Sequence, residues 1–332
     1  MSLLPTIVNW YGGKRKLARQ IISIMPEHEH YVEVFMGGAA VYFNKPKASR
    51  NTLNDINSNL VNLFIQVRDN YDAFAEKLYL TLYSRDQYKI FYKSYQNDFK
   101  NCSDLEKAVM YFFITKASFS AKVVKSLHGD FSSSVKRTPS SINLDLIISM
   151  KVLREKLDGV SLENREFHYI LDKYDNKETL FYLDPPYYVT IKETRYYEYF
   201  FSISQHRQLA LILNKTKSPF LLSYDNVPEV INSYKDYFIQ RLSTVYARGK
   251  TGSKKTTELL ITNFRAKKPQ LDAFDEVTIE VEEVTDKEKL KSEHEVKLKT
   301  EIELENQLKQ KIDEPIRDNK PGQKTEQLTF GL

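Results

Sequence analysis

This sequence has little cysteine and no long hydrophobic run. Its 332 residues include a single cysteine, Cys102, which excludes an internal disulfide framework and a multi-cysteine zinc site. We expect Cys102 to be a small core residue. No run reaches the roughly 18 apolar residues that span a bilayer, and no apolar stretch with a small-residue cleavage site stands near residue 1. These absences predict a cytoplasmic protein with no membrane partner.

Patterns for metal or nucleophilic chemistry are also missing. His28 and His30 have a His-x-His spacing, but no carboxylate or cysteine stands at a confirming distance, so we expect no metal site. No Ser-His-Asp pattern is evident. The formal net charge is +5, which favours a polyanionic partner only weakly, because nucleic-acid-binding proteins concentrate their cations on one face.

The most informative stretch begins at Leu180 and reads Leu-Phe-Tyr-Leu-Asp-Pro-Pro-Tyr. Its first four residues predict a parallel strand buried on both faces, ending at Asp184. Pro185 and Pro186 have a fixed φ and no N–H, so the backbone carbonyls form a rigid edge of acceptors. A carboxylate and such a carbonyl can accept both hydrogens of an exocyclic amine, while Tyr187 lies against a flat base. The alternative is a stiff turn without function.

Two glycine turns precede helices near the N-terminus. The first contains Trp10 and Lys14, and its helix start suits an anionic group, although a simple loop is the alternative. The second, beginning at Gly37, follows a predicted strand that contains Glu33. The next predicted strand ends in Asp55, and an acidic residue about 20 positions after such glycines is placed to bind ribose hydroxyls. This order predicts a nucleoside cofactor at the carboxyl edge of a parallel sheet.

The spacing of the predicted strands indicates an α/β protein with an insertion. Residues 72–178 are too many for one crossover and predict a mostly helical inserted domain between catalytic segments 1–71 and 179–266. Residues 267–332, rich in Glu and Lys, are expected to lie outside the catalytic domain. Basic residues near aromatics or glycines are candidate DNA contacts, with core aromatics and a solvated loop as the alternatives. These candidates are Lys122, Lys125, Lys136, Arg137, Arg248 and Lys250.

Together these segments resemble the Dam-type DNA adenine N6-methyltransferases, in which the recognition insert precedes an Asp-Pro-Pro-Tyr motif. The resemblance covers roughly residues 9–264. Its glycine turn departs from the usual Phe-x-Gly-x-Gly, because Ala39 stands at the second glycine. The matching segments, in the order of the family, are Trp10 with Gly12-Gly13-Lys14, Glu33 to Gly38, Asn54 to Asn57, Asp184 to Tyr187 and Glu258 to Asn263.

The resemblance implies a Rossmann-like, S-adenosylmethionine-dependent methyltransferase sheet with an inserted target-recognition domain. It implies that Asp184 and the Pro185 carbonyl hold N6 of a flipped adenine, that Pro186 completes the motif and that Tyr187 stacks on the base. The residues implied to bind S-adenosylmethionine are Trp10, Lys14, Glu33, Gly37, Asp55 and Asp184.

We therefore expect site-specific, direct methyl transfer to adenine N6 in double-stranded DNA. A cytosine N4-methyltransferase is an alternative, since the same acceptors suit any exocyclic amine. A non-catalytic DNA-binding protein on a methyltransferase scaffold is an alternative from another class. The expected setting is a bacterium or a phage-infected cell. Pairing with a restriction endonuclease and binding of another protein by the C-terminal extension are further expectations.

Overall fold

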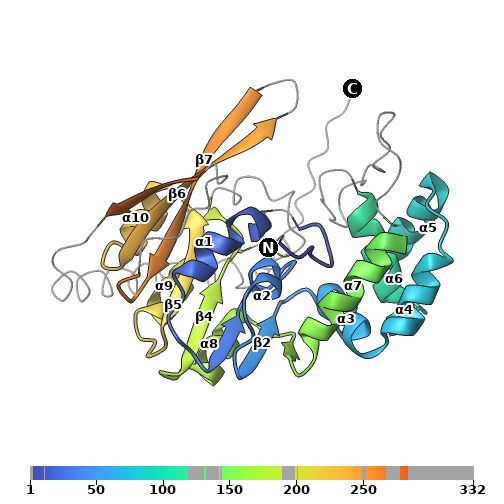
Figure 1. Ribbon diagram of the computed structural model, residues 1–332, viewed down its shortest axis with the longest axis horizontal. Coiled ribbons are helices and arrows are strands. Elements are labelled where there is room, and N and C mark those ends of the chain that lie inside the picture. Colours follow the sequence, from blue (N-terminus) through green and yellow to red (C-terminus); the bar gives the residue numbers. More distant parts are fainter. Residues whose placement is uncertain are drawn as a thin grey trace, which may run out of the picture.

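The fold is built on one mixed sheet, with a helical bundle beside it (Figure 1). The computed structural model describes residues 3–10, 12–118, 131, 142, 144–188, 199, 201–248, 252–266 and 277–282, of which 243–248, 252–256 and 277–282 are described by their backbone alone. Eight strands occur in these ranges. They are β1 His30–Glu33, β2 Arg50–Asn54, β3 Ser161–Glu163, β4 Thr179–Leu183, β5 Phe220–Asp225, β6 Phe238–Arg248, β7 Gly252–Thr262 and β8 Val277–Glu282.

The directions of the strands place several loops at one edge of the sheet. The strand order is β3-β2-β1-β4-β5-β7-β6-β8, in which β1 to β5 run parallel and β7 runs antiparallel to both of its neighbours. Because β2, β1, β4 and β5 are adjacent, the residues that follow them emerge side by side at the carboxyl edge, where ligands bind in sheets of this kind. The predicted α/β class is confirmed.

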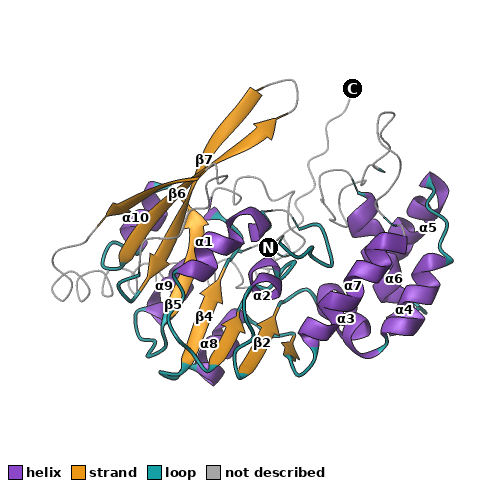
Figure 2. Ribbon diagram, in the orientation of Figure 1, coloured by secondary structure: helices purple, strands orange, loops and turns teal. Residues whose placement is uncertain are grey.

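Side chains alternate between two buried cores along the strands. In β4, Leu180 and Tyr182 belong to one core and Phe181 and Leu183 to the other, and none of the four is more than 1% exposed. The prediction of a strand covered on both faces is therefore confirmed. One face is covered by the 3₁₀ helix η1 Lys14–Leu17, α1 Ala18–Ser23 and α2 Ala40–Asn44, and the other by α8 Phe167–Tyr174, α9 Ile203–Leu213 and α10 Pro228–Ser233 (Figure 2).

A helical bundle stands beside the β2 and β3 end of the sheet (Figure 1). Its helices are α3 Ser58–Asp69, α4 Tyr71–Tyr79, α5 Arg85–Gln96, α6 Asp104–Ala117 and α7 Leu144–Leu157. Tyr111, Phe112 and Phe113 of α6 are at most 1% exposed, so these insert aromatics are core residues. No helix in the described ranges is long and apolar enough to cross a membrane.

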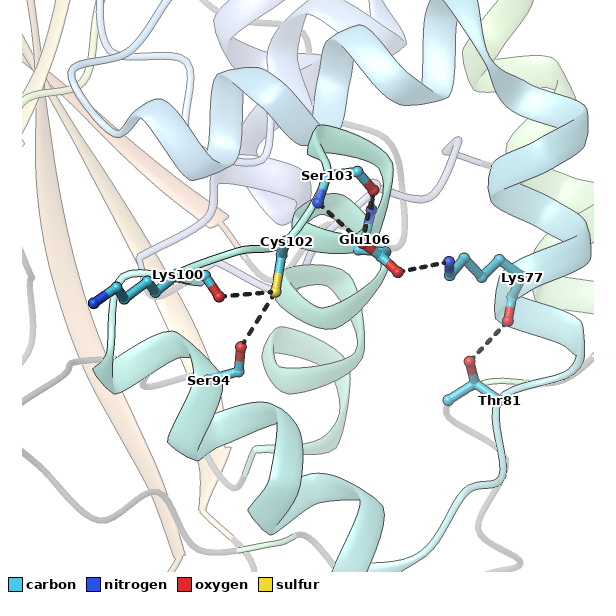
Figure 3. Close-up of polar contacts among 7 residues, drawn as sticks. All are labelled: Lys77, Thr81, Ser94, Lys100, Cys102, Ser103 and Glu106. Carbon is cyan, nitrogen blue, oxygen red and sulfur yellow. Dashed lines mark hydrogen bonds and ion pairs between the residues drawn. The ribbon is translucent and has the colours of Figure 1, made fainter.

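The turn between α5 and α6 illustrates how polar groups fasten this bundle (Figure 3). Ser103 and Glu106 form a reciprocal capping box that satisfies backbone N–H groups at the start of α6. The Glu106 carboxylate also lies 3.1 Å from the Lys77 ammonium of α4, which joins the two helices. Cys102 is half-buried and packs against the core from its edge, with its sulfur 3.8 Å from the Lys100 carbonyl.

The structure places elements of the sheet layer inside the predicted insert, residues 72–178. β3 lies within 72–178 and pairs in parallel with β2 through Thr52 opposite Ser161, and α8 packs on the sheet. Only three residues form β3, and its side chains are not deeply buried, so no apolar run marked it. The helical segment that interrupts the sheet therefore ends at α7.

Part of the predicted C-terminal extension, residues 267–332, also belongs to the sheet, because residues 277–282 form β8 on the outer side of β6. Their sequence, Val-Thr-Ile-Glu-Val-Glu, has the period-two alternation of a strand and could have indicated it. β6 and β7 form a long antiparallel hairpin, in which Arg248, Lys254 and Lys255 belong to the strands and not to the connecting loop.

Candidate active site

Three separate segments meet beyond the ends of β1 and β2. The Gly37 N–H donates to Oδ2 of Asp55 at 3.0 Å, and the Asn57 N–H donates to Oδ1 at 2.9 Å. The indole of Trp10 lies against Gly37, where a Cβ would stand 2.8 Å from its Cδ1 and Nε1 atoms. The structure therefore brings the predicted Trp10, Gly37 and Asp55 together at the carboxyl edge.

Glycine is required at position 37 for two reasons. Its φ is +45°, a region that side-chain-bearing residues rarely adopt, and the indole occupies the space that a Cβ would need. Ala39, which stands at the usual second glycine, has φ +51° and is the N-cap of α2. The departure from the glycine pattern therefore leaves the backbone in a left-handed conformation with a methyl group attached.

Asp55 is an ionised acceptor at neutral pH. Burial raises its pKa to about 6, while the N–H groups of Asn57 and Gly37 act in the opposite direction. A carboxylate can accept about four hydrogen bonds, so these two donors leave capacity for hydroxyl groups. Asn54, one residue earlier, fixes the surrounding loops, because its side chain bonds the Val34 carbonyl at 2.9 Å and both backbone groups of Arg165.

Lys14 is the cation at the end of β4. Its ammonium lies 2.8 Å from Asp184 Oδ1, 3.7 Å from Glu258 Oε2 and 4.7 Å from the centre of the Tyr187 ring, and it donates to the Gly12 carbonyl. Lys14 is only 4% exposed, so these interactions are sheltered from water. The structure therefore joins the first glycine turn to the Asp-Pro-Pro-Tyr segment.

Burial raises the pKa of Asp184 to about 6. The Lys14 ammonium lowers this pKa and the Glu258 carboxylate raises it. Two carboxylates thus surround one ammonium, an arrangement that favours a cationic or hydrogen-donating ligand. Pro185 and Pro186 follow directly, with Pro185 buried.

Tyr187 is held at both its hydroxyl and its ring. The hydroxyl donates to Glu258 Oε2 at 2.8 Å, and the ring stacks on Tyr224 with centroids 6.1 Å apart. Tyr224 is hydrogen-bonded in turn to His206 of α9. The next residue, Tyr188, donates its N–H to Asp225 Oδ1 at 3.1 Å. Residues at the end of β5 therefore support the Asp-Pro-Pro-Tyr segment.

Glu33 is 2% exposed, and its carboxyl accepts the Tyr31 hydroxyl at 2.9 Å. Burial raises its pKa to about 8, so the side chain is predominantly protonated at neutral pH. A neutral acid is a different group from the carboxylate that the sequence suggests.

The sequence alone indicated no role for Glu258, although this residue begins the matching segment Glu258 to Asn263. Two contacts between the insert and the site were also not predicted. The Asn57 side chain caps α3 and donates to the Tyr111 hydroxyl of α6 at 3.0 Å. Lys116, in the last turn of α6, lies 3.4 Å from both the Thr6 carbonyl and Asn9 Oδ1. Residue spacing carried no signal for these long-range contacts.

The predicted DNA contacts fall largely beyond the described part of the chain. Lys122, Lys125, Lys136, Arg137 and Lys250 lie outside the described residues, and Arg248 ends β6 with only its backbone described. No group of three or more potential metal ligands occurs among the described residues.

The chain matches known methyltransferases over most of its length. The family model described as D12 class N6 adenine-specific DNA methyltransferase matches residues 10–248. The Type II methyltransferase M1.LlaDCHI of Lactococcus lactis subsp. cremoris is 25% identical over 278 residues, which covers 79% of this chain and 96% of that protein. M.MjaIII of Methanocaldococcus jannaschii is 26% identical over 293 residues, covering 80% and 100%. A DNA adenine methylase of Salmonella typhi is 26% identical over 226 residues, covering 65% and 79%.

Proposed function

Because the chain belongs to the D12 class of N6 adenine-specific DNA methyltransferases, we propose specific roles for its site residues in methylating adenine N6 of DNA. Asp184 and the Pro185 carbonyl accept the two hydrogens of the amine, and Tyr187 stacks on the base. The two prolines keep this edge rigid. The substrate is a flipped adenine at a specific sequence in double-stranded DNA.

The strongest support for this proposal is the position of Asp184 and Tyr187. Asp184 leaves the sheet directly after buried β4 and lies, with Tyr187, beside the Lys14 ammonium. An acceptor, an aromatic ring and a cation from distant segments thus share one place at the carboxyl edge. This place is next to the Trp10, Gly37 and Asp55 cluster.

The methyl donor implied by the family is S-adenosylmethionine, which supplies a methyl group from its sulfonium when bound. The residues present fit it. Asp55 suits ribose hydroxyls, the Trp10 indole suits the adenine ring, and Gly37 lets the indole lie close to the backbone that bonds Asp55. The excess of carboxylate around Lys14 suits a nearby positive sulfonium.

The chain lowers the barrier by holding the amine. The lone pair of N6 is delocalised into the ring, and accepting both amine hydrogens localises that pair as the nitrogen attacks. Asp184, with a pKa of about 6, is ionised at neutral pH and can accept the proton that N6 loses. Flipping the base costs a few kcal/mol, and stacking on Tyr187 returns about 1–3 kcal/mol.

The test is to incubate the purified protein with DNA and labelled S-adenosylmethionine and to digest the DNA to nucleosides. We expect label in N6-methyl-2′-deoxyadenosine, whereas label in N4-methyl-2′-deoxycytidine or in no nucleoside would refute the proposal. Asp184→Asn should reduce transfer by at least about 1000-fold while DNA binding changes little. Near-normal turnover of that variant would remove Asp184 from its role.

The wider setting is part of the same proposal. The segment from α4 to α7 carries target recognition, and Lys122, Lys125, Lys136, Arg137, Arg248 and Lys250 contact DNA phosphates. Two relatives are named Type II methyltransferases, which supports pairing with a restriction endonuclease. We place the protein in the cytoplasm of a bacterium or phage-infected cell, working without a metal, with the C-terminal extension as a docking segment. Challenge of methylated host DNA with endonucleases tests the pairing.

A further inference from the structure

Glu258 enters the site from the hairpin. It lies on β7, opposite Asp225 of β5, at the last residue pair that β7 shares with β5. Beyond this pair, residues 252–257 of β7 pair with β6 and project from the sheet (Figure 1). The Glu258 side chain is 12% exposed.

A single oxygen of Glu258 serves two groups of the site. Oε2 accepts the Tyr187 hydroxyl at 2.8 Å and lies 3.7 Å from the Lys14 ammonium. Glu258 contacts neither Pro185 nor the acceptor oxygens of Asp184 in these interactions. Its hydrogen bond and ion pair therefore reach the amine only through Tyr187 and Lys14, while its charge also raises the pKa of Asp184.

The Lys14–Asp184 ion pair opposes the proposed role of Asp184. An ammonium 2.8 Å from Oδ1 occupies one acceptor position and lowers the basicity of the carboxylate that must hold the amine. An ammonium has three donors on a flexible stem, and Glu258 Oε2 stands within a small movement of it. If the Lys14 ammonium separates from Asp184, Glu258 can therefore serve as its counter-ion.

We propose that Glu258 is a positioning residue that orients Tyr187 against the flipped base and takes over the Lys14 ammonium when Asp184 accepts the amine. The inference rests on the proposed function and extends it to a residue on the hairpin. Fixing the Tyr187 hydroxyl sets the plane of the ring on which the base lies. Moving the ammonium restores both oxygens of Asp184 as acceptors.

The pH dependence of turnover separates this role from a structural one. The titratable groups around Asp184 are Lys14, Glu258, Glu33, Tyr182 and Tyr187. Among them Glu258 raises the pKa of Asp184 and Lys14 lowers it. Removing the charge of Glu258 should therefore move the acid limb of the turnover profile to lower pH, whereas loss of packing alone should leave it in place.

The experiment compares Glu258→Gln with Tyr187→Phe in steady-state methyl transfer, over a range of S-adenosylmethionine and DNA concentrations and from pH 5 to 8, so that both kcat and KM are obtained. Glu258→Gln keeps an acceptor for the phenol and removes the charge. We expect it to lower kcat at least about tenfold, with KM for both substrates within about threefold and the acid limb at lower pH. Tyr187→Phe should lose several-fold in kcat with the acid limb unchanged, because it removes only a neutral hydroxyl.

Glu178→Gln is the matched control, because it is the same substitution at an exposed residue next to the amino end of β4. It should behave as the unmodified protein. Thermal unfolding of every variant checks that each one folds.

The proposal would be overturned if Glu258→Gln left both kcat and the acid limb unchanged. It would also be overturned if kcat fell together with thermal stability while the acid limb stayed in place. If Glu258→Gln does not fold, full turnover in Tyr187→Phe overturns the positioning of Tyr187. Failure of the proposed function is distinguishable, because the unmodified protein would then place no methyl group on adenine N6.

Discussion

Replacing Glu33 by Gln should give a protein whose stability, relative to that of the unmodified protein, increases as the pH rises toward neutrality. Glu33 is 2% exposed on β1, and its carboxyl accepts the Tyr31 hydroxyl at 2.9 Å. Burial raises its pKa from 4.5 to about 8. Gln has the same size and keeps an oxygen that accepts the phenol, but it does not titrate.

The magnitude follows from proton linkage. Between pH 4.5 and about 8 the folded protein keeps a proton on Glu33 that the unfolded chain has released, so the free energy of unfolding falls as the pH rises. The slope is about 1.4 kcal/mol per pH unit for one group. From pH 5.5 to 7.5 the stability of Glu33→Gln relative to the unmodified protein should therefore rise by about 2–3 kcal/mol.

Urea unfolding at pH 5.5, 6.5 and 7.5, followed by circular dichroism at 25 °C, measures this difference. Measurements stay at or below pH 7.5 because burial lowers the pKa of the neighbouring Lys45 to about 8. Glu178→Gln, at an exposed position, should give a curve parallel to that of the unmodified protein. A difference between Glu33→Gln and the unmodified protein that stays constant within about 0.5 kcal/mol across the three pH values would refute the reasoning.

Three further predictions concern the site and its support. Turnover should rise with pH through a midpoint near 6 as Asp184 ionises, measured in single-turnover transfer, and a flat profile from pH 5 to 7 would contradict this assignment. Gly37→Ala should weaken S-adenosylmethionine binding at least tenfold by calorimetry, because its Cβ would stand 2.8 Å from the Trp10 indole and φ is +45°; unchanged affinity would contradict the close approach. Asn57→Ala should lower the free energy of unfolding by about 1–3 kcal/mol, because the cap of α3 is lost and the Tyr111 hydroxyl loses a partner. Urea unfolding tests this, and a change under about 0.5 kcal/mol would show that neither hydrogen bond contributes to stability.

Local chemistry explains why the central strand and its motif could be predicted. The apolar run ending at Leu183 marks a doubly covered strand, and the following prolines exclude its continuation whatever the rest of the fold does. The turn at Gly37 could likewise be predicted, because glycine readily adopts the positive φ that this turn between a strand and a helix has. The α/β class followed from the order of these elements.

The short and outer strands could not be assigned in the same way. β3 has three residues and no apolar run, so its place in the sheet depends on pairing with β2. β8 has a strand-like alternation, but a charged composition around it favoured a solvated segment. Pairing with a neighbouring strand decided both cases.

The sequence by itself determined which groups are available for chemistry: the carboxylate of Asp184, the stiff carbonyl of Pro185 and the ring of Tyr187, all within four consecutive residues. Only the tertiary structure decided what surrounds them. Lys14 and Glu258 are far apart along the chain, and they meet near Asp184 because η1 lies against the carboxyl end of β4 while β7 of the hairpin pairs with β5 beside it. The altered pKa of Asp184 has the same origin, since burial and neighbouring charge arise from packing between distant segments and not from residue type.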